Sequence, residues 1–433
     1  MSLPQLIEIV PPRSPLRARM TVPGSKSVTN RALVLAALAR GPIELRGALW
    51  SEDTQVMVDC LRRLGFVVEV KADPREFCNR TIRVEGQGGS VPRAGTEEEP
   101  LSLFVGNAGT AARFLVALVC LGRGVFRIHG VERMHERPQD SLLAALRQLG
   151  YRIESVNNRL PAVVYGAGPM PGECSVSIEK SSQFASALLL AARSGGWTVK
   201  THGENAEESP YVQMTGQMLA RFPDAGGVFE IEPDCSSGSY FWAAGFLTGA
   251  SGAPGVEVLH WPDSNWQIDQ QFPYYYPLPP TVSWRGDLGD SIMMAIVLAP
   301  FSGRIIRFKD LGNLRAQECE RVLALKSELT RCGARVEERG DELTVYPGLL
   351  RGAIIETYRD HRVAMCFAVL GLSTPGIRLR DPGCVRKTFP NFFQKLAAPP
   401  PHGLGVVVID PDSGRKLEPD ELFAGGNMES QVE

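Results

Sequence analysis

The stretch MVDCLRRLGFVVEV, at residues 57–70, joins an amphipathic helix to a strand through a single glycine. Its apolar residues recur at helical spacing up to Leu64, and the residues after Gly65 alternate between apolar and polar, which is typical of a half-buried strand. Gly65 suits the left-handed conformation that commonly ends a helix. The stretch therefore predicts one α/β unit.

The same pattern occurs twice more, in SLLAALRQLGYRIES at 141–155 and in RVLALKSELTRCGARVEE at 321–338. Gly150 and Gly333 take the place of the glycine in these two stretches. Repetition at this level predicts an α/β protein that is assembled from similar supersecondary blocks. Helix–glycine–strand units also occur in other α/β folds, so the repeat alone does not select one fold family.

A second pattern is a set of polar, small-residue stretches that each lead directly into an apolar helix. They are VPGSKSVTN (22–30), GNAGTA (106–111), ERPQD (136–140), KSSQF (180–184), CSSGS (235–239) and GDLGD (286–290). A helix N-terminus offers unpaired N–H groups and a partial positive charge, which suit an anion. The same residue types are also ordinary N-caps, and this explains any single stretch. Six of them, most with a cation or an amide, favour a site for an anionic small molecule.

Composition excludes several classes of protein. The 433 residues suffice for two or three domains at roughly 150 residues each, and the net charge of -2 comes without a single-sign block, which argues against nucleic acid and membrane surfaces as partners. The nine cysteines and six histidines lack metal-ligand and disulfide-framework spacing, so we expect neither a metal nor a cofactor. PGSKS lacks the spacing of a phosphate-binding P-loop. The N-terminus has no secretory pattern, and no apolar run reaches about 18 residues, so a cytoplasmic location is expected.

Three segments are predicted to lie outside the repeated units. Residues 91–100 and 270–287 are rich in Pro, Gly or acidic residues and are interpreted as surface insertions. Residues 398–405 resemble a linker into a tail that contains one strand, GVVVID, and a frayed polar end.

Nine distinctive segments follow one another between about residue 20 and residue 396: PGSKSVTNRAL, GNAGTAARFL, ERPQDSLLAAL, SSQFASALLLAA, DCSSGSYFWAAG, DSIMMA, LRAQECER, DHRVAM and KTFP. In this order and wording the chain resembles the 5-enolpyruvylshikimate-3-phosphate synthases of the enolpyruvyl transferase superfamily. The resemblance implies an α/β fold of two similar domains, each made of three repeated α/β units in an inside-out α/β barrel. It places the active site in the interdomain cleft and implies that the domains close on substrate. We expect one domain at 23–235, the other at 1–22 and 236–397, and a linker and extra tail at 398–433.

The resemblance also implies a reaction. The enolpyruvyl group of phosphoenolpyruvate is transferred to a ring hydroxyl of shikimate 3-phosphate, and phosphate is released through a tetrahedral ketal-phosphate intermediate. The partners are then two small-molecule substrates, without nucleic acid or membrane, and a monomer is expected. The sister enzyme that uses UDP-N-acetylglucosamine has a reactive Cys in the loop before its Arg-Pro pair, and GVERMHERP lacks that Cys.

Residue roles follow from the matched motifs. By the resemblance, Asp290 is the general base, and Glu318 with Lys26 moves protons at the methylene carbon. Donor binding is assigned to Lys26, Asn107, Gly109, Arg137, Gln183, Arg321, His361, Arg362 and Lys387. Acceptor binding is assigned to Lys26, Ser27, Arg31, Ser181, Ser182, Gln183, Tyr211, Asp290, Asn313 and Gln317. Outside these motifs, Arg321 and Arg362 would be surface or salt-bridge arginines and Asp290 an N-cap, while Arg113 and Cys319 are expected to be structural.

Two departures from the family fall in the acceptor set. Gln317 stands where the family has a second Lys, and Glu208 stands where it has a Ser. Loss of one partner of a buried charge pair costs about 2–5 kcal/mol, and an added carboxylate repels a phosphate. One interpretation is a phosphate pocket rebuilt around Lys180, which could neutralise Glu208. The other is a shikimate-like acceptor without the phosphate, in a specialised pathway. A catalytically inactive ligand-binding relative would be expected to lose Asp290 or Glu318, and both are present.

Overall fold

A computed structural model describes residues 3–203, 209–249 and 255–425. The chain forms two compact units. Unit A comprises Gly24–Arg75 and Asn79–Glu232, and unit B comprises Met1–Pro23, Glu76–Cys78 and Pro233–Glu433. Unit A is thus inserted into unit B, whose first residues precede it in the chain.

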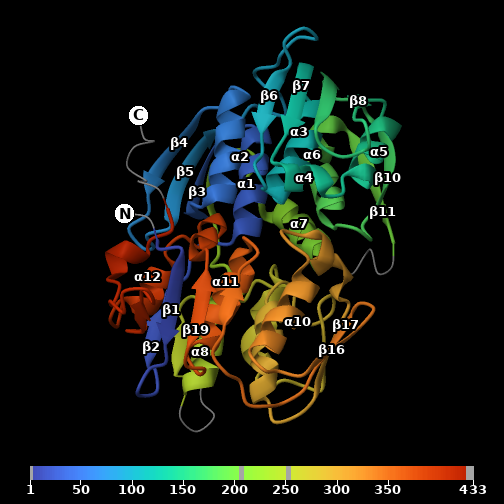
Figure 1. The fold of residues 1–433 in the computed structure, drawn as a ribbon. Coiled ribbons are helices and arrows are strands. Elements are labelled where there is room, and N and C mark those ends of the chain that lie inside the picture. The colour runs from blue at the N-terminus through green and yellow to red at the C-terminus, as the bar shows by residue number, and fades with distance from the viewer. Residues whose placement is uncertain (1–2, 204–208, 250–254, 426–433) are drawn as a thin grey trace. The chain divides into compact units, whose positions relative to one another are not determined.

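Within the described residues, unit A contains three sheets, whose elements are coloured from blue to green in Figure 1. Their strand orders are β12-β3-β5-β4, β6-β7-β9-β8 and β10-β11. The elements are α1 Lys26–Leu38, β3 Pro42–Leu49, α2 Glu52–Arg63, β4 Val68–Ala72, β5 Asn79–Glu85, β6 Leu101–Phe104, α3 Gly109–Cys120, β7 Arg123–His129, α4 Glu132–Glu136, α5 Asp140–Gln148, β8 Arg152–Glu154, β9 Ala162–Ala167, β10 Gly172–Ser177, α6 Gln183–Gly195, β11 Trp197–His202, α7 Pro210–Arg221 and β12 Gly227–Glu230.

The described part of unit B also contains three sheets, with orders β14-β15-β17-β16, β18-β19-β1-β20 and β13-β2. The elements are β1 Leu6–Val10, β2 Ala18–Met20, α8 Cys235–Thr248, β13 Val256–Val258, the 3-10 helix η1 Ile268–Tyr275, β14 Thr281–Ser283, α9 Ile292–Leu298, η2 Ala299–Phe301, β15 Ile306–Lys309, η3 Leu311–Ala316, α10 Arg321–Arg331, β16 Val336–Arg339, β17 Glu342–Val345, β18 Ile354–Glu356, α11 His361–Leu370, β19 Ile377–Arg380, η4 Pro382–Lys387, α12 Phe392–Ala397, β20 Val407–Ile409 and η5 Pro419–Leu422.

All four four-stranded sheets repeat one pattern of strand directions. Each begins with a parallel pair (β12–β3, β6–β7, β14–β15 and β18–β19) and continues with two antiparallel pairings. In three of them the predicted glycine joins a helix to an edge strand, with φ of 89° at Gly65, 94° at Gly150 and 92° at Gly333. These φ values lie in the left-handed region that favours glycine. The helix–glycine–strand prediction is therefore confirmed at all three positions.

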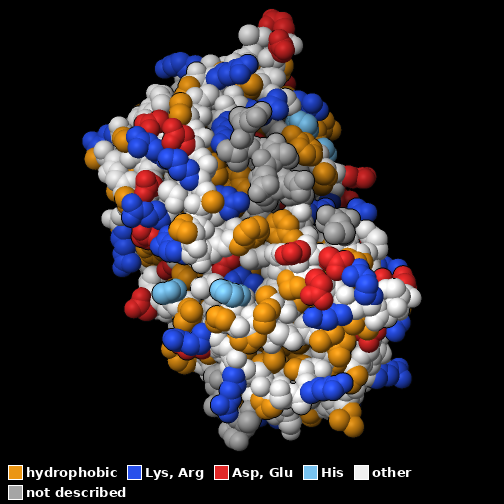
Figure 2. All heavy atoms as spheres, turned by 90° about the vertical axis from the view of Figure 1, so that its left-hand side faces the viewer, with side chains coloured by type: hydrophobic (Ala, Val, Ile, Leu, Met, Phe, Trp, Pro, Cys, Tyr) orange, Lys and Arg blue, Asp and Glu red, His pale blue; other side chains and the backbone are white. Residues whose placement is uncertain are grey.

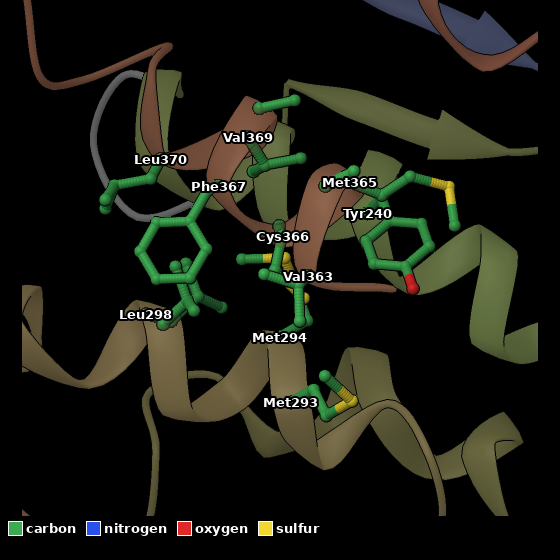
Figure 3. Close-up of a cluster of buried hydrophobic side chains, with 14 of the residues drawn as sticks. Tyr240, Met293, Met294, Leu298, Val363, Met365, Cys366, Phe367, Val369 and Leu370 are labelled. Atoms are coloured by element: carbon green, nitrogen blue, oxygen red, sulfur yellow. The ribbon is translucent and has the colours of Figure 1, made fainter. Parts of the chain in front are cut away.

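Three helices at the centre of each unit pack on one another. They are α1, α3 and α6 in unit A, and α8, α9 and α11 in unit B. The α9 and α11 segments are apolar on nearly all sides, and Figure 3 shows Met294 and Leu298 of α9 beside Val363 and Phe367 of α11. A helix that is apolar all round is stable in a core. Five of the six predicted polar stretches lead into these central helices, and the sixth leads into α5.

Two segments differ from the prediction because packing buries them. Residues 270–287 are not a surface insertion: Phe272 of η1 and Leu278 are buried, and β14 pairs with β15. The tail contains the predicted strand, as β20, but it belongs to unit B, since β20 pairs with β1 and η5 contacts α12. Its polar end, 426–433, lies outside the described residues.

Glu76–Cys78, between β4 and β5, belongs to unit B although both strands belong to unit A. The buried Glu76 carboxylate contacts Lys395 Nζ at 2.7 Å and accepts hydrogen bonds from Thr21 Oγ1 at 2.6 Å and from Asn391 Nδ2 at 3.1 Å. Phe77 packs edge-on against Phe423 in the tail, with ring centroids 5.5 Å apart. The chain is therefore anchored in unit B at this point by charge and by an aromatic contact.

The surface in Figure 2 carries interspersed basic and acidic side chains, in keeping with the net charge of -2. None of the helices in the described ranges is long and apolar enough to span a membrane. Within those same ranges, no group of three His, Cys, Asp or Glu side chains is arranged to hold a metal ion.

Candidate active site

Arg321, the first residue of α10, is the centre of a buried ion network in unit B. Its Nε lies 2.7 Å from Asp360 Oδ2, and its Nη2 lies 2.9 Å from Glu318 Oε2. Asp290 Oδ1 is 3.9 Å from Nη1. Burial alone would lower the pKa of Arg321, but these carboxylates raise it above its ordinary value, so the guanidinium is charged. Arg321 is thus no surface arginine.

Arg362, at the start of α11, fixes the side chain of Asp290. Its Nη2 lies 2.9 Å from Asp290 Oδ2, and its Nη1 donates to the Tyr240 hydroxyl of α8 at 3.5 Å. Burial again works against the charge, and the nearby Asp290 does most to raise the pKa of Arg362 well above its ordinary value. The N-cap of α9 is Ser291, so Asp290 is not merely a helix cap.

Lys387 and His361 complete the predicted donor set of unit B. Lys387 Nζ, at the end of η4, lies 3.7 Å from Glu318 Oε1, so Glu318 contacts two cations. His361 is buried, and its Nδ1 lies 3.9 Å from Asp360 Oδ1. The structure therefore brings together the predicted unit B residues Asp290, Glu318, Arg321, His361, Arg362 and Lys387.

The segment before α10 carries the first family departure. Gln317 accepts a short hydrogen bond from Arg321 Nη1 through its amide oxygen. Asn313 is half-buried in η3. Cys319 Sγ lies 3.5 Å from an Asp360 oxygen, and burial raises the pKa of its thiol. A thiol of this kind is a weak nucleophile, which suits the structural role expected for Cys319.

In unit A, Lys26 is the first residue of α1 and its Nζ lies 3.3 Å from Asp53 Oδ2 in the first turn of α2. Both side chains are largely buried. Ser25 caps the helix by accepting a hydrogen bond from the Val28 backbone N–H. The cap and the carboxylate hold Lys26 at the helix N-terminus.

Arg137 contacts the start of α3. Its Nη1 donates to the Asn107 backbone carbonyl at 3.2 Å and to Asn107 Oδ1 at 3.4 Å. A Cβ at Gly109 would lie 2.7 Å from Arg137 Nη2 and 2.6 Å from Arg113 Nη1. Gly109 is therefore needed for the two guanidinium groups to approach the α3 backbone.

Gln183, the first residue of α6, is held by α3. Its Oε1 accepts from Arg113 Nη1 at 2.8 Å, and its Nε2 donates to Thr110 Oγ1 at 3.3 Å. Ser181 Oγ accepts the Gln183 backbone N–H at 3.3 Å, and Ser182 is the N-cap. Arg113 thereby orients Gln183, in line with the structural role expected for it.

Arg31 is 1% exposed and uses its donors within unit A. It donates to Thr215 Oγ1 at 2.8 Å and Ser186 Oγ at 3.0 Å, and to the carbonyls of Ser27 at 2.9 Å and Tyr211 at 3.3 Å. Burial lowers its pKa to about 10. Arg31 braces the segments that carry Ser27 and Tyr211, and its direct contact with an acceptor stays a prediction.

Lys180 contacts Asp140 rather than any other described carboxylate, with Nζ 2.6 Å from Oδ2. Both side chains are exposed. Glu208, which Lys180 was proposed to neutralise, lies outside the described residues. The Asp140 contact gives Lys180 a different partner.

Sequence reasoning gave no role to four residues of these clusters: Asp53, Tyr240, Asp269 and Asp360. Asp360 had a usable signal, because an Asp directly before an apolar helix is a typical N-cap. Its side chain accepts from the Arg362 backbone N–H at 2.8 Å while it also binds Arg321. Asp269 directly precedes the segment 270–287, which was interpreted as a surface insertion.

The family model for EPSP synthase (3-phosphoshikimate 1-carboxyvinyltransferase) matches residues 10–225 and 223–396. The chain belongs to this family. Among similar curated proteins, the 3-phosphoshikimate 1-carboxyvinyltransferase of Trichormus variabilis is 35% identical over 424 residues, which cover 88% of this chain and 96% of that protein. The protein of the same name from Opitutus terrae is 37% identical over 440 residues, covering 92% and 98%.

Solved structures of this superfamily share the fold. EPSP synthase from Acinetobacter baumannii has a TM-score of 0.66 at 20% identity, covering 94% of this chain and all 100% of that one. The enolpyruvyl transferase NikO from Streptomyces tendae has a TM-score of 0.67 at 15% identity, covering 93% and 98%. The predicted family and the predicted α/β fold of two similar parts are thereby confirmed.

Proposed function

We propose that this protein is a 3-phosphoshikimate 1-carboxyvinyltransferase, which transfers the enolpyruvyl group of phosphoenolpyruvate to a ring hydroxyl of shikimate 3-phosphate and releases phosphate. The observation that carries the proposal is the agreement of relatives of that name over about nine-tenths of the chain. The buried network of Asp290, Glu318 and Arg321 supports it with the charged groups that such a reaction needs.

The donor carries about three negative charges, and binding it requires several placed cations. We assign this role to Arg321, Arg362 and Lys387 of unit B and to Lys26 and Arg137 of unit A. The remaining donor-binding positions are Asn107, Gly109, Gln183 and His361. Charged donors and oriented amides at helix starts suit the phosphate and carboxylate of phosphoenolpyruvate.

We assign the proton transfers to Asp290 and Glu318. The acceptor oxygen bonds to the central carbon of the donor, its proton passes to Asp290, and the methylene carbon takes a proton from Glu318 with the help of Lys26. The bond from the central carbon to the phosphate oxygen then breaks, a methyl proton returns to Glu318, and the proton held by Asp290 passes to the departing phosphate. Arg362, 2.9 Å from Asp290, favours the ionised carboxylate that a base requires.

The acceptor is assigned to a mostly neutral set of side chains, together with Lys26, Asp290 and the bracing residue Arg31. The neutral members are Ser27, Ser181, Ser182, Gln183, Tyr211, Asn313 and Gln317. Because the Gln317 oxygen accepts from Arg321, its amide N–H groups are the donors that it can offer. Gln317 is a neutral amide where the family has a cation, and Lys180 contacts Asp140. Both observations favour a second candidate substrate, a shikimate-like acceptor without the phosphate.

The deciding experiment is phosphate release from phosphoenolpyruvate, measured with shikimate 3-phosphate and separately with shikimate, with Asp290→Asn as the blank. We expect turnover with the phosphorylated acceptor that is lost in the blank. Turnover with shikimate and not with shikimate 3-phosphate would show that the acceptor is the unphosphorylated one. Tight donor binding without phosphate release from either acceptor would indicate the ligand-binding relative.

A further inference from the structure

Asp269 is a buried carboxylate of unit B that the proposed reaction does not use. It lies in η1 and is 3% exposed. Its Oδ1 accepts from the Ser291 backbone N–H at 2.9 Å and from Ser291 Oγ at 2.6 Å. Its Oδ2 accepts a short hydrogen bond from Ser236 Oγ. Three donors directed at two oxygens are the arrangement expected for an ionised carboxylate.

These bonds connect the starts of two central helices. Ser236 is the second residue of α8, and Ser291 is the N-cap of α9. Ser291 directly follows Asp290, the residue whose carboxylate lies 2.9 Å from Arg362 of α11. Fixing the Ser291 backbone and hydroxyl therefore fixes the peptide from which the Asp290 side chain projects.

We infer that Asp269 is a positioning residue, which acts through Ser291 to hold the Asp290 carboxylate against Arg362 in the geometry required for proton transfer. The inference rests on the proposed function, in which Asp290 is the base. Asp269 itself need not contact either substrate.

The charges around Asp269 agree with this role. Burial raises the pKa of Asp269, and the nearby Asp290 raises it further, whereas Ser236, Ser291 and Arg362 lower it. Among the described residues, the charged or titratable groups near it are Asp290 before α9, Arg362 of α11 and, through Arg362, both Asp234 at the N-cap of α8 and Tyr240 of α8. The α9 segment itself, IMMAIVL, offers no charge. Asp269 is thus a second negative charge that shares Arg362 with Asp290.

A purely structural role makes a different prediction. If Asp269 served only to hold η1 and cap α9, its loss would lower stability and would leave kcat unchanged. A positioning role requires a fall in kcat both in Asp269→Asn and in Ser291→Ala, which removes no charge. The pH profile reports the like charge beside Asp290, which disfavours ionisation of the base.

The test compares Asp269→Asn and Ser291→Ala with wild type in phosphate release at saturating donor and acceptor. Loss of a hydrogen-bonded charge typically changes a rate by roughly 10- to 100-fold. We expect kcat of Asp269→Asn to fall by about that factor, with KM for phosphoenolpyruvate changed less than about twofold, and a smaller fall for Ser291→Ala. The acidic limb of the pH profile should move to lower pH in Asp269→Asn, since the repelling charge is gone.

Asp287→Asn is the matched control. Asp287 is a half-buried carboxylate that precedes α9 and accepts the Ser283 backbone N–H at 2.7 Å. It should alter stability without changing kcat or the pH profile. Asp269→Asn with the kcat and pH profile of wild type would overturn the inference, whereas an inactive wild type would overturn the proposed function.

A crystal structure of Asp269→Ala provides a readout that does not depend on activity. We expect the contact of Asp290 with Arg362, which is 2.9 Å in the native chain, to be lost or lengthened. An unchanged contact would also overturn the inference.

Discussion

The ion network of unit B and the cation sites of unit A differ in the groups that hold their cations in place. In unit B, Arg321 and Arg362 are held by carboxylates, with Asp360, Glu318 and Asp290 at 2.7–3.9 Å. In unit A, Arg137 is held by the neutral oxygens of Asn107, at 3.2 and 3.4 Å. Lys26, with its carboxylate partner Asp53, is the exception in unit A.

This difference indicates that the cations of the two units have different roles. Neutral acceptors orient Arg137 without cancelling its charge, so this guanidinium keeps its attraction for an anion. In unit B the cations orient Asp290 and Glu318, the two carboxylates to which we assign the proton transfers. In the proposed function, Arg137 of unit A is thus assigned to donor binding, and the residues of unit B are assigned both to donor binding and to proton transfer.

The strongest challenge to this difference in roles is Asp290→Asn. We expect kcat to fall by about 10²- to 10⁴-fold, because a general base is lost, while donor binding stays close to wild type. Phosphate release and calorimetric titration with phosphoenolpyruvate measure the two quantities. An active variant would show that Asp290 is not the base and would contradict the assignment of proton transfer to unit B.

The buried ion pair of Glu76 and Lys395 lies outside the candidate site, so its loss should affect stability and not catalysis. Lys395→Met leaves Glu76 buried without its cation, which typically costs about 3–5 kcal/mol. The free energy of unfolding should fall while kcat at low temperature stays near wild type. Urea titration and phosphate release measure both, and a fall in kcat without a loss of stability would contradict this expectation.

The same pair predicts a pH dependence of stability. Burial alone would raise the pKa of Glu76, but Lys395, Thr21 and Asn391 together lower it below its ordinary value. A carboxyl group whose pKa is lowered by folding stabilises the protein above its ordinary pKa and loses that contribution as pH falls through the lowered value. Acid should therefore destabilise wild type more steeply than Glu76→Gln, and parallel curves would refute this.

Substitution of Arg137 tests whether a guanidinium held by neutral oxygens contributes to donor binding. Charge-assisted hydrogen bonds contribute about 1.5–3 kcal/mol each, so Arg137→Ala should raise KM for phosphoenolpyruvate by roughly 10- to 100-fold. The loss of kcat should be smaller. Arg137→Lys keeps the positive charge but lacks the two-pronged guanidinium, so its KM should lie between those of wild type and Arg137→Ala. An alanine variant with the KM of wild type would remove Arg137 from the donor site.

Gly109→Ala is the mildest change. The added Cβ would meet Arg137 and Arg113 at 2.7 and 2.6 Å, so both guanidinium groups must shift. These are the ends of flexible side chains, and we expect a rise in KM for phosphoenolpyruvate of several-fold, with a small change in kcat. Gly216→Ala, where a Cβ would meet nothing within 4 Å, is the control. Equal KM values for the two variants would contradict the close approach at Gly109.

The predictable parts of the fold are those with local causes. The turns at Gly65, Gly150 and Gly333 follow from apolar spacing and from the left-handed φ that glycine tolerates. The starts of α1, α3 and α6 follow likewise from polar stretches before apolar runs. Strand order was not predicted, because it depends on pairings between distant segments such as β12 with β3.

The site was predicted through family motifs, and its supporting residues were missed for physical reasons. Asp360 contacts Arg321 across 39 positions of sequence, and no local pattern predicts such a pair. Asp269 was missed because it directly precedes residues 270–287, whose Pro and Tyr residues resemble a surface loop, while packing of η1 against α8 buries it. Local patterns identify where a helix begins, but tertiary packing decides which carboxylate it meets.

The pairing of β1 with β19 and β20 constrains the order in which the chain can fold during synthesis. Leu6 pairs with Arg380, and Glu8 pairs with Ile409, so β1 has no sheet partners until nearly the whole chain has been made. Unit A is complete once residue 232 has left the ribosome. Domains generally fold as units, the earlier one first, and contacts of long sequence separation form slowly. The first strand of this protein is therefore among the last to be incorporated, and a nascent chain that stops before β19 carries an unpaired β1 that is exposed to misassembly.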